Sequence, residues 1–505
     1  MNQYFLVLFI CIMNIVPCFG QGRILMIDNS IDSIVNVEFK YNSPINNPLN
    51  PILKADKSWE LNMNKDPYAA PFSGGVWYDE EDGLFKMWYS AGGNKKHGLI
   101  TCYATSADGK VWDKPSLDIL EGTNIVDTLE HDCCTVLLDK QELDRAKRFK
   151  MFNVRFDTAD RVSMVLKYSE DGIHWSEPVA VSGDLFDRCS AYYDPFREHY
   201  VLSLKTKDIN NRRARNYLAH KNPEMAVSLA HRVKENKYDK HIKFWFSADK
   251  KDPRNPNFPE IAPAIYNHDA IAYENVLLGQ FNIWQGPENK DCVKLNVQKR
   301  NEILIGFSED GFNWKRENFT PFIGVNDNPL AWNAGNIQSS MGSPIIVGDS
   351  LYFYYSARYN SRPTHPSNFA TGLATMRRDG FVSAVQHSKS DTAIIITKPF
   401  DITNPYLFIN VEAKEGKVIV DLLPEYCDYT ENKLQFSVSK VDSTKVMIAD
   451  LSTFPNLDKT QKYRLIIRLA GAELYSFWFS NSRNGHSGGF TAGGGPGLNA
   501  LGIDK

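Results

Sequence analysis

The stretch SADGKVW, residues 106–112, recurs along this chain as SEDGIHW at residues 169–175 and as SEDGFNW at residues 308–314. A degenerate copy, SADK, occupies residues 247–250, and a fifth copy, RDGF, occupies residues 378–381. Asp-Gly favours a tight turn because glycine accepts a positive φ and the Asp side chain bonds the neighbouring backbone. The Trp that follows can fold back onto the sheet and pack against the next one. Copies spaced roughly 60 to 80 residues apart indicate a repeat architecture.

A hairpin of β-rich segments precedes the turn in the repeated units. These segments pair as residues 75–79 with 84–89, 135–139 with 148–152, 190–194 with 199–203, and 343–347 with 350–355. Three or four strands in each unit, repeated five times with turn signals, predict a five-bladed β-propeller.

The repeat stops after residue 383. Short alternating segments without the Asp-Gly turn follow, such as residues 392–397 and 463–468, and they are typical of an antiparallel β-sandwich. A chain of 505 residues also exceeds what one hydrophobic core usually supports. We therefore expect an all-β protein, with a five-bladed β-propeller over residues 21–385, a C-terminal β-sandwich over residues 386–482, and a Gly-rich tail over residues 483–505 that is flexible or docked as a loop.

The N-terminus carries a pattern typical of export. Residues 5–16 (FLVLFICIMNIV) are apolar but too few to span a bilayer comfortably, and Cys18 and Gly20 are small residues placed for cleavage before Gln21. We expect a signal peptide over residues 1–20 and a secreted or periplasmic protein. Lipidation of Cys18 is the alternative. No later segment predicts a membrane span.

Composition narrows the partners. The net charge of −3 offers no basic field for nucleic acid, while 12% aromatic residues suit both β-sheet packing and sugar binding. Six cysteines remain after removal of the signal peptide, too few for a disulfide scaffold and without a CxxC pair. Adjacent Cys133 and Cys134 are interpreted as small buried residues on a strand, with a vicinal disulfide or a metal site as alternatives. We expect a monomer without a cofactor, although structural calcium among the Asp-rich loops stays open.

Acidic residues stand at the starts of the first strands, which a propeller gathers around its axis. Asp132 and Asp187 each lie four residues before the aligned residues Val136 and Ala191. Glycosidic cleavage needs one protonated carboxyl group and one ionised carboxylate. Glu274 is our candidate general acid because its apolar surroundings are expected to raise its pKa. Asp132 is the candidate base or nucleophile, and Asp187 the acid that orients the pair.

Alternatives stay open for each of these residues. Asp269 rivals Glu274 as the acid, and Asp66 rivals Asp132 as the base. A single Asp in a propeller is often a turn residue, and this is our interpretation of the three that end first strands in parallel positions: Asp79, Asp139 and Asp194.

Other polar and aromatic residues are candidates for substrate contact. Arg188 could pair with Asp187 or hold a hydroxyl or carboxylate of a substrate. His131 and His268 each precede an Asp, although a lone His is more often structural. Trp332 could stack on a sugar ring or pack in the core. The basic cluster at residues 212–215 could bind an acidic sugar or lie in a solvated loop.

The Ser-x-Asp-Gly-x-x-Trp turns, the five units and the trailing sandwich together resemble the five-bladed glycosidases of glycoside hydrolase families 32 and 43. The resemblance covers residues 50–480 at the level of architecture, and it implies an Asp, an Asp and a Glu on the inner strands of successive blades. The chain departs from the family 32 motifs. Asn64-Lys65-Asp66-Pro67 stands where Asn-Asp-Pro-Asn-Gly is expected, and Asp187-Arg188-Cys189 only echoes Arg-Asp-Pro. The resemblance therefore implies a divergent member.

The function expected from the sequence is that of a glycoside hydrolase. It would release terminal sugars, for example arabinofuranose or fructofuranose, from plant or microbial polysaccharide. The alternative is a non-catalytic carbohydrate-binding propeller, and a lyase or phosphorylase on the same scaffold is a third hypothesis. Convergence of Asp132, Asp187 and Glu274 would favour hydrolysis.

Overall fold

The computed structural model describes residues 22–27, 29–63, 65–93, 98–156, 161–233, 239–358, 368–426 and 433–505. The chain divides into two compact units. The propeller unit comprises Tyr41–Ser383 and Gly488–Lys505, and the sandwich unit comprises Ala384–Ser487 together with the residues up to Lys40. The expected signal peptide, residues 1–20, lies outside the described residues.

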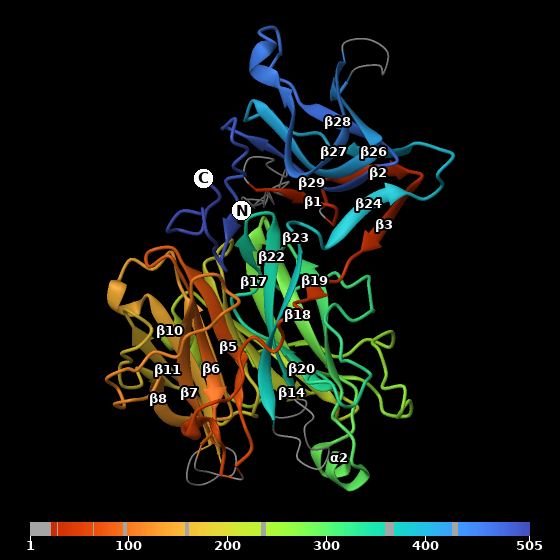
Figure 1. Cartoon of the computed structure of the whole chain (residues 1–505). Coiled ribbons are helices and arrows are strands. Elements are labelled where there is room, and N and C mark those ends of the chain that lie inside the picture. Colours follow the sequence, from red (N-terminus) through yellow and green to blue (C-terminus); the bar gives the residue numbers. More distant parts are fainter. Residues whose placement is uncertain are drawn as a thin grey trace, which may run out of the picture. The chain divides into compact units, whose positions relative to one another are not determined.

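The propeller unit contains five antiparallel sheets, the blades (Figure 1). Blade 1 holds β5 (Ala69–Asp79), β6 (Leu84–Ala91), β7 (Leu99–Ser106) and β8 (Ile125–His131); blade 2 holds β9 (Cys133–Leu138), β10 (Phe149–Phe156), β11 (Val162–Ser169) and β12 (Ala180–Val181); blade 3 holds β13 (Ser190–Asp194), β14 (His199–Lys207), β15 (Arg213–His220) and β16 (Lys243–Phe246). Blade 4 holds β17 (Ala264–Glu274), β18 (Val276–Trp284), β19 (Asn301–Ser308) and β30 (Phe490–Thr491); blade 5 holds β20 (Gly335–Ser339), β21 (Ile345–Val347), β22 (Ser350–Arg358), β23 (Phe369–Arg377) and β4 (Ile45–Asn46). The all-β, five-bladed prediction is confirmed.

Few helical segments interrupt the strands. They are α1 (Pro223–Leu229), α2 (Asn289–Leu295) and the 3₁₀ turns Ser58–Glu60 and Arg145–Lys147 in the propeller unit, with Leu451–Thr453 in the sandwich unit.

Strand direction gives the propeller axis two distinct ends. The first strands of neighbouring blades contact one another, and each second strand returns antiparallel to the first. One end of the axis, the strand-start end, therefore gathers the starts of first strands, the ends of second strands and the starts of third strands. The strand-finish end gathers the opposite termini. A residue's place along its strand thus decides which end it reaches.

The repeated turn joins each blade to the one before it. Gly109, Gly172 and Gly311 have φ between 73° and 79°, which only glycine adopts freely. Their carbonyls accept hydrogen bonds from aromatic side chains of the preceding blade: Tyr354 to Gly109 at 2.8 Å, Trp88 to Gly172 at 2.6 Å, and Tyr192 to Gly311 at 3.4 Å. In the blade 5 turn the acceptor is a side chain instead: Asp379 accepts a hydrogen bond at 2.6 Å from the hydroxyl of Tyr273, which belongs to blade 4. The degenerate copy at residues 247–250 differs because it follows the fourth strand of blade 3, not the third.

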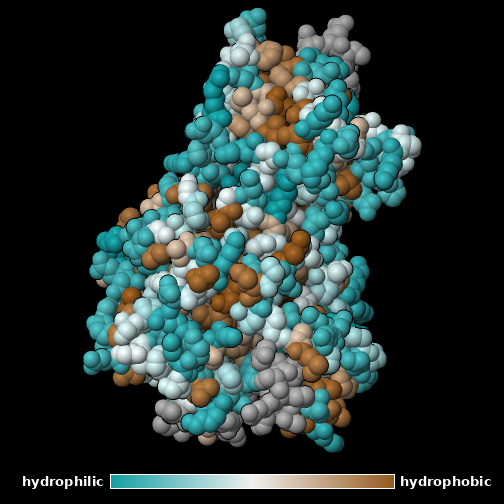
Figure 2. Space-filling model, in the orientation of Figure 1, coloured by the Kyte–Doolittle hydropathy of each residue, from teal (hydrophilic) through white to brown (hydrophobic). Residues whose placement is uncertain are grey.

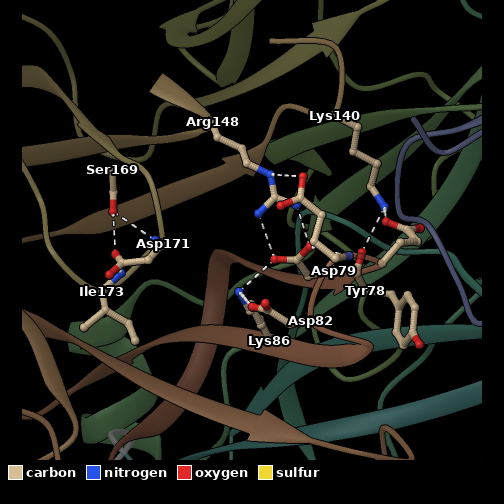
Figure 3. A network of polar contacts seen from close by, with 12 residues as sticks. Tyr78, Asp79, Asp82, Lys86, Lys140, Arg148, Ser169, Asp171 and Ile173 are labelled. Carbon is tan, nitrogen blue, oxygen red and sulfur yellow. Dashed lines mark hydrogen bonds and ion pairs between the residues drawn. The ribbon is translucent and has the colours of Figure 1, made fainter. Parts of the chain in front are cut away.

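Asp79, Asp139 and Asp194 are turn residues, as predicted. Each accepts a hydrogen bond from the amide two positions further on. Figure 3 shows Asp79 between Lys86 and Arg148, with nitrogen–oxygen distances of 2.7 and 3.0 Å. Burial opposes ionisation, but Arg148 and Lys86 prevail and lower the pKa of Asp79 to about 2. Because Arg148 belongs to blade 2, this ion pair also ties two blades together.

The Gly-rich tail docks at the strand-finish end. Strand β30 pairs with the last residues of β17, and the carbonyls of Gly493 and Gly494 accept hydrogen bonds from the amides of Tyr78 and Ile346 at 3.1 and 3.0 Å. A Cβ on Gly493 would lie 2.2 Å from the carbonyl oxygen of Gly342, so glycine is required for this close approach. The boundaries therefore differ from those expected: the tail joins the propeller unit from Gly488 onward.

The sandwich unit is one antiparallel sheet of nine strands, nearly closed on itself. Its strands are β1 (Ile24–Leu25), β2 (Ile31–Val35), β3 (Val37–Tyr41), β24 (Val382–Gln386), β25 (Ala393–Thr397), β26 (Tyr406–Pro424), β27 (Leu434–Asp450), β28 (Tyr463–Ala470) and β29 (Glu473–Ser480). Alternating side chains of β26, β28 and β29 fill its core, as the predicted β-sandwich requires. Residues 22–40, expected in the propeller, supply strands to this unit because β1 pairs with β29 and β2 with β25.

Five cysteines, Cys102, Cys133, Cys134, Cys189 and Cys292, are buried free thiols, and Cys427 lies outside the described residues. The adjacent Cys133 and Cys134 lie at the start of β9 as buried residues, which was the preferred interpretation. Within the described ranges, no helix has the length and apolar character needed to cross a membrane. On the face that Figure 2 displays, hydrophilic residues cover most of the surface and hydrophobic ones lie between them in small groups.

Candidate functional site

Asp132 and Arg188 meet at the strand-start end of the axis. Asp132 links β8 to β9, and Arg188 precedes β13 in the next blade. The Arg188 guanidinium lies 3.6 Å from the Asp132 carboxylate and 3.4 Å from the ring centroid of Phe72. Arg188 holds a φ of 58°, a left-handed conformation that is costly for a residue with a Cβ. Arg188 therefore pairs with Asp132 across the blades, and not with its sequence neighbour Asp187.

Asp187 has its own cationic partner. Lys205, near the end of β14, forms an ion pair with its carboxylate. Burial would raise the pKa of Asp187, but Lys205, helped by Arg188 and Arg213, lowers it below its ordinary value. The Asp187 side chain is 42% exposed and that of Asp132 is 21% exposed, so solvent reaches both side chains, whereas the Oδ2 atom of Asp132 is buried without a hydrogen-bond partner.

Tyr266 lies beside these carboxylates. It occupies an irregularity near the start of β17, between Ile265 and Asn267, and it is half-buried. The Lys299 ammonium lies 3.2 Å from its hydroxyl, and the Arg188 guanidinium lies 5.8 Å from its ring centroid. Burial raises the pKa of the phenol, yet Lys299 and Arg188 outweigh burial and lower that pKa below its ordinary value.

Two further arginines complete this end. Arg213, the first residue of β15, lies 5.9 Å from the Tyr266 ring and pairs with Glu288 at 2.8 Å. Arg358 ends β22, and its charge acts on both Tyr266 and Tyr68. The strand-start end thus combines solvent-reachable carboxylates, aromatic rings and several cations from successive blades.

Glu274 lies at the other end of β17 from the end at which Asp132 and Asp187 lie. It is the last residue of β17, eight positions after Tyr266, and a strand of that length spans about 25 Å. It is therefore at the strand-finish end, where its carboxylate pairs with Arg378 at 2.9 Å. Strand β30 also pairs with it there, as Glu274 lies opposite Phe490.

Asp269, the rival acid, lies inside the axis. Its carboxylate accepts hydrogen bonds from Ser339 at 2.6 Å, from Ser73 at 3.2 Å and from Asn267 at 3.0 Å. These donors come from three blades, which places the carboxylate between the first strands. Burial raises the pKa of Asp269, although its hydrogen bonds act against this. Asp269 is 1% exposed.

The two histidines are packing residues. His131 is buried with its Nε2 3.0 Å from the Thr101 hydroxyl, and burial, with Arg188, lowers its pKa to about 3. His268 is fully buried among aromatic rings, including Phe281 and Trp314 at centroid distances of 4.5 and 4.8 Å. Burial lowers the pKa of His268 as well. Both imidazoles are buried, and substrate contact through them stays a prediction.

Asp66 and Trp332 contact neighbouring side chains. The buried Asp66 carboxylate accepts a hydrogen bond from the Asn62 amide at 3.4 Å, within the loop before β5. Trp332 is half-buried and packs on Tyr355 with ring centroids 5.7 Å apart, which matches the packing alternative. No group of three or more His, Cys, Asp or Glu side chains in the described part of the chain is arranged to hold a metal ion.

Five residues of this end were not predicted from the sequence: Phe72, Tyr266, Lys299, Lys205 and Arg358. The three cations share a position along their strands. Lys205 and Arg358 lie at or near the ends of second strands, and Lys299 precedes a third strand. Antiparallel pairing brings those positions to the same end as the starts of first strands. Searching first strands alone therefore finds the acids and misses the cations.

Comparisons with known proteins give structural similarities only. No protein-family model matches the chain, and no curated protein matches it. Solved structures similar to it include an N-acetylgalactosamine deacetylase from F. plautii in complex with blood group B trisaccharide, with TM-score 0.44, 13% identity, and coverage of 69% of this chain and 97% of that one. A putative glycoside hydrolase from Bacteroides ovatus has TM-score 0.40 and 12% identity, covering 66% and 96%. A thermostable family-43 glycoside hydrolase has TM-score 0.39 and 12% identity, covering 62% and 95%. Similarities of this size assign no activity to this chain.

Proposed function

We propose that this chain is a glycoside hydrolase with its active site at the strand-start end of the propeller. The observation that carries the proposal is the position of Asp132 and Asp187. These carboxylates come from successive blades and both side chains reach solvent; Asp132 lies 3.6 Å from the Arg188 guanidinium, and Asp187, the chain neighbour of Arg188, pairs with Lys205. Glycosidic cleavage requires two carboxyl groups that flank one bond. The proposal also includes two predictions from the sequence: the protein is exported, and the sugar released is a terminal furanose of a polysaccharide-derived glycan.

The roles follow from the charges around each carboxyl group. Asp132 is the proposed base or nucleophile. Asp187, whose pKa Lys205 lowers against the effect of burial, is the proposed ionised carboxylate that orients the pair. Asp269 replaces Glu274 as the proposed proton donor because burial raises its pKa.

A second candidate function is non-catalytic sugar binding. It is favoured by the hydrogen bonding of Asp269, whose carboxylate already accepts from three neighbouring side chains. A carboxylate satisfied in this way can serve to hold the blades together without taking part in any reaction.

The test is product release from a panel of plant and microbial glycans. We expect Asp132→Asn and Asp187→Asn to lower kcat/KM by roughly 10²- to 10⁴-fold, the usual contribution of such a group. Asp269→Asn should in addition remove the alkaline limb of the pH–rate profile, which a purely structural change would not do. Glu274→Gln is the matched control and should leave kcat/KM of the folded protein near the wild-type value.

Two results would contradict the proposal. If the wild-type chain binds saccharides but releases no product from any glycan, it is the carbohydrate-binding propeller. If activity survives in both Asp132→Asn and Asp187→Asn but collapses in folded Glu274→Gln, the active site is at the other end of the axis.

A further inference from the structure

Three buried cations from three different blades surround Tyr266. Arg188, Lys299 and Arg358 have exposures of 5%, 4% and 5%. Lys299 contacts the Tyr266 hydroxyl at 3.2 Å, and Arg188 lies 5.8 Å from its ring. Arg358 lies 5.1 Å from the ring centroid of Phe369, which packs 5.5 Å from the Phe72 ring that Arg188 covers. The charge of Arg358 acts on Tyr266 and on Lys299. Blades 3, 4 and 5 therefore each bring one positive charge to the same place.

Negative charge in this cluster does not match the positive charge. Asp132 offers one carboxylate, 3.6 Å from Arg188. Among the described residues, Lys299 and Arg358 form no ion pair. The Nη1 of Arg188 and both Nε and Nη1 of Arg358 are buried without a hydrogen-bond partner. Charged groups in protein interiors are normally paired because removing them from water is costly.

Two neighbouring arginines differ from this cluster because their partners are within reach. Arg215 is equally buried, but it donates to the Ser203 hydroxyl at 2.9 Å and to the Arg188 carbonyl at 2.8 Å. Arg213 has Glu288 as its partner. The chain thus satisfies the cations that hold the blades and leaves donors open around Tyr266, where the half-exposed carboxylates lie.

We propose that Arg188, Lys299 and Arg358 form a site for an oxyanion, carried by an acidic sugar as its carboxylate or supplied as free phosphate. The guanidinium fork matches the paired oxygens of a carboxylate or phosphate, and an ammonium adds a compact charge beside it. The bound anion supplies the missing negative charge and hydrogen-bond acceptors. The inference shares its location with the proposed active site, and it makes the substrate or co-substrate anionic.

The test is calorimetric binding to the full chain, with galacturonate, glucuronate, galactose, glucose and inorganic phosphate as probes. We expect at least one anion to bind at least tenfold more tightly than either neutral sugar. Arg358→Met should weaken that binding tenfold or more, while Arg358→Lys should recover part of it. The matched control is Lys207→Met, an exposed lysine at the end of β14 that bonds Asn211, and its affinity should equal that of the wild type.

The probes separate the two sources of the anion. Tight binding of a uronate, without competition from phosphate, assigns the anion to the sugar. Tight binding of phosphate, with uronates no better than neutral sugars, assigns it to free phosphate. Equal affinities for all probes, or an anion affinity unchanged in folded Arg358→Met, would overturn the inference.

Binding is measured without turnover, so the two proposals fail separately. If the chain binds uronate or phosphate through Arg358 but cleaves no glycan, the oxyanion site is supported and the proposed hydrolase activity is contradicted. If the chain cleaves neutral glycans through Asp132 but binds none of the anions, the hydrolase is supported and the oxyanion site is contradicted.

Discussion

The two ends of the propeller axis are built from the same repeated blades but differ in how some of their buried cations are paired. At the strand-finish end, Arg378 contacts both Glu274 and Asp504, at 2.9 and 2.8 Å. At the strand-start end, Arg358 and Lys299 form no ion pair among the described residues. Arg378 is therefore paired, whereas Lys299 and Arg358 carry a desolvation cost that no ion pair among the described residues offsets. Binding sites commonly carry such a cost, and stability has to come from elsewhere in the fold.

The C-terminal tail reinforces this difference. At the strand-finish end, strand β30 of the tail pairs with blade 4, and the following residues Gly493 and Gly494 accept hydrogen bonds from blades 1 and 5. Asp504, close to the C-terminus, completes the Arg378 ion pair. The chain thus uses its own last residues to satisfy the blades at one end, while the solvent-reachable carboxylates Asp132 and Asp187 lie at the other.

The largest expected effect is on stability at the strand-finish end. Arg378→Met leaves two buried carboxylates, Glu274 and Asp504, without this cation, and breaking such a pair costs about 3–5 kcal/mol. Urea denaturation of the variant and the wild type measures the change. A loss well below this range would show that the two carboxylates find other partners.

Substituting methionine for Arg358 at the strand-start end gives the matched comparison of the free energy of unfolding. Arg358→Met removes a buried cation that has no carboxylate partner among the described residues, and it should leave the free energy of unfolding unchanged or raise it by about 1 kcal/mol. The two methionine variants should therefore shift the urea midpoint differently, and in opposite directions if Arg358 is destabilising. Equal losses in both would remove the distinction between the ends.

A smaller effect is expected from acid. The pKa of Asp79 is lowered from 3.8 to about 2, so its contribution is present above the unfolded value and is lost as pH falls through the folded one. Between roughly pH 4 and pH 2 the protein should lose up to about 2 kcal/mol through this group. Urea midpoints at both ends of that window, compared between the wild type and Asp79→Asn, isolate the contribution. The acid-induced loss should be smaller in Asp79→Asn, and an identical loss would assign it to other carboxylates.

The fold was predictable because its signals are local. The Asp-Gly turns and the hairpins before them depend on residues a few positions apart, and Asp79 could be assigned to a turn from its place at the end of a strand. The site depends on strand length, which the sequence pattern does not fix. β17 has 11 residues and β13 has five, so an acid in the apolar run of β17 can lie at either end of the axis. Asp132 and Asp187 precede their strands and were placed correctly at the starts.

The cations were not predictable for a different reason. Lys299 and Arg358 are distant in sequence from the first strands, and an isolated Lys or Arg in a loop or at a strand end is usually solvated. Their importance comes from burial and from the lack of a partner, both of which are properties of the assembled blades.

The smallest expected effect is the ionisation of a single tyrosine, and it reports the charge at the strand-start end directly. Burial raises the pKa of tyrosines such as Tyr200 and Tyr354, whereas Lys299 and Arg188 lower that of Tyr266 despite burial. A near-ultraviolet titration should show one phenolate forming before the others. Tyr266→Phe should remove it, and Lys299→Met should move it to higher pH.

A bound anion is expected to change the pKa of Tyr266. A bound carboxylate or phosphate would offset the charges of Lys299 and Arg188, so a saturating anion should raise the pKa of Tyr266 again, while galactose should not. A shift of this first phenolate with the anion would locate the unpaired charge at Tyr266. If the first phenolate persists in Tyr266→Phe, the excess positive charge acts on another tyrosine and the contrast between the two ends has to be redrawn.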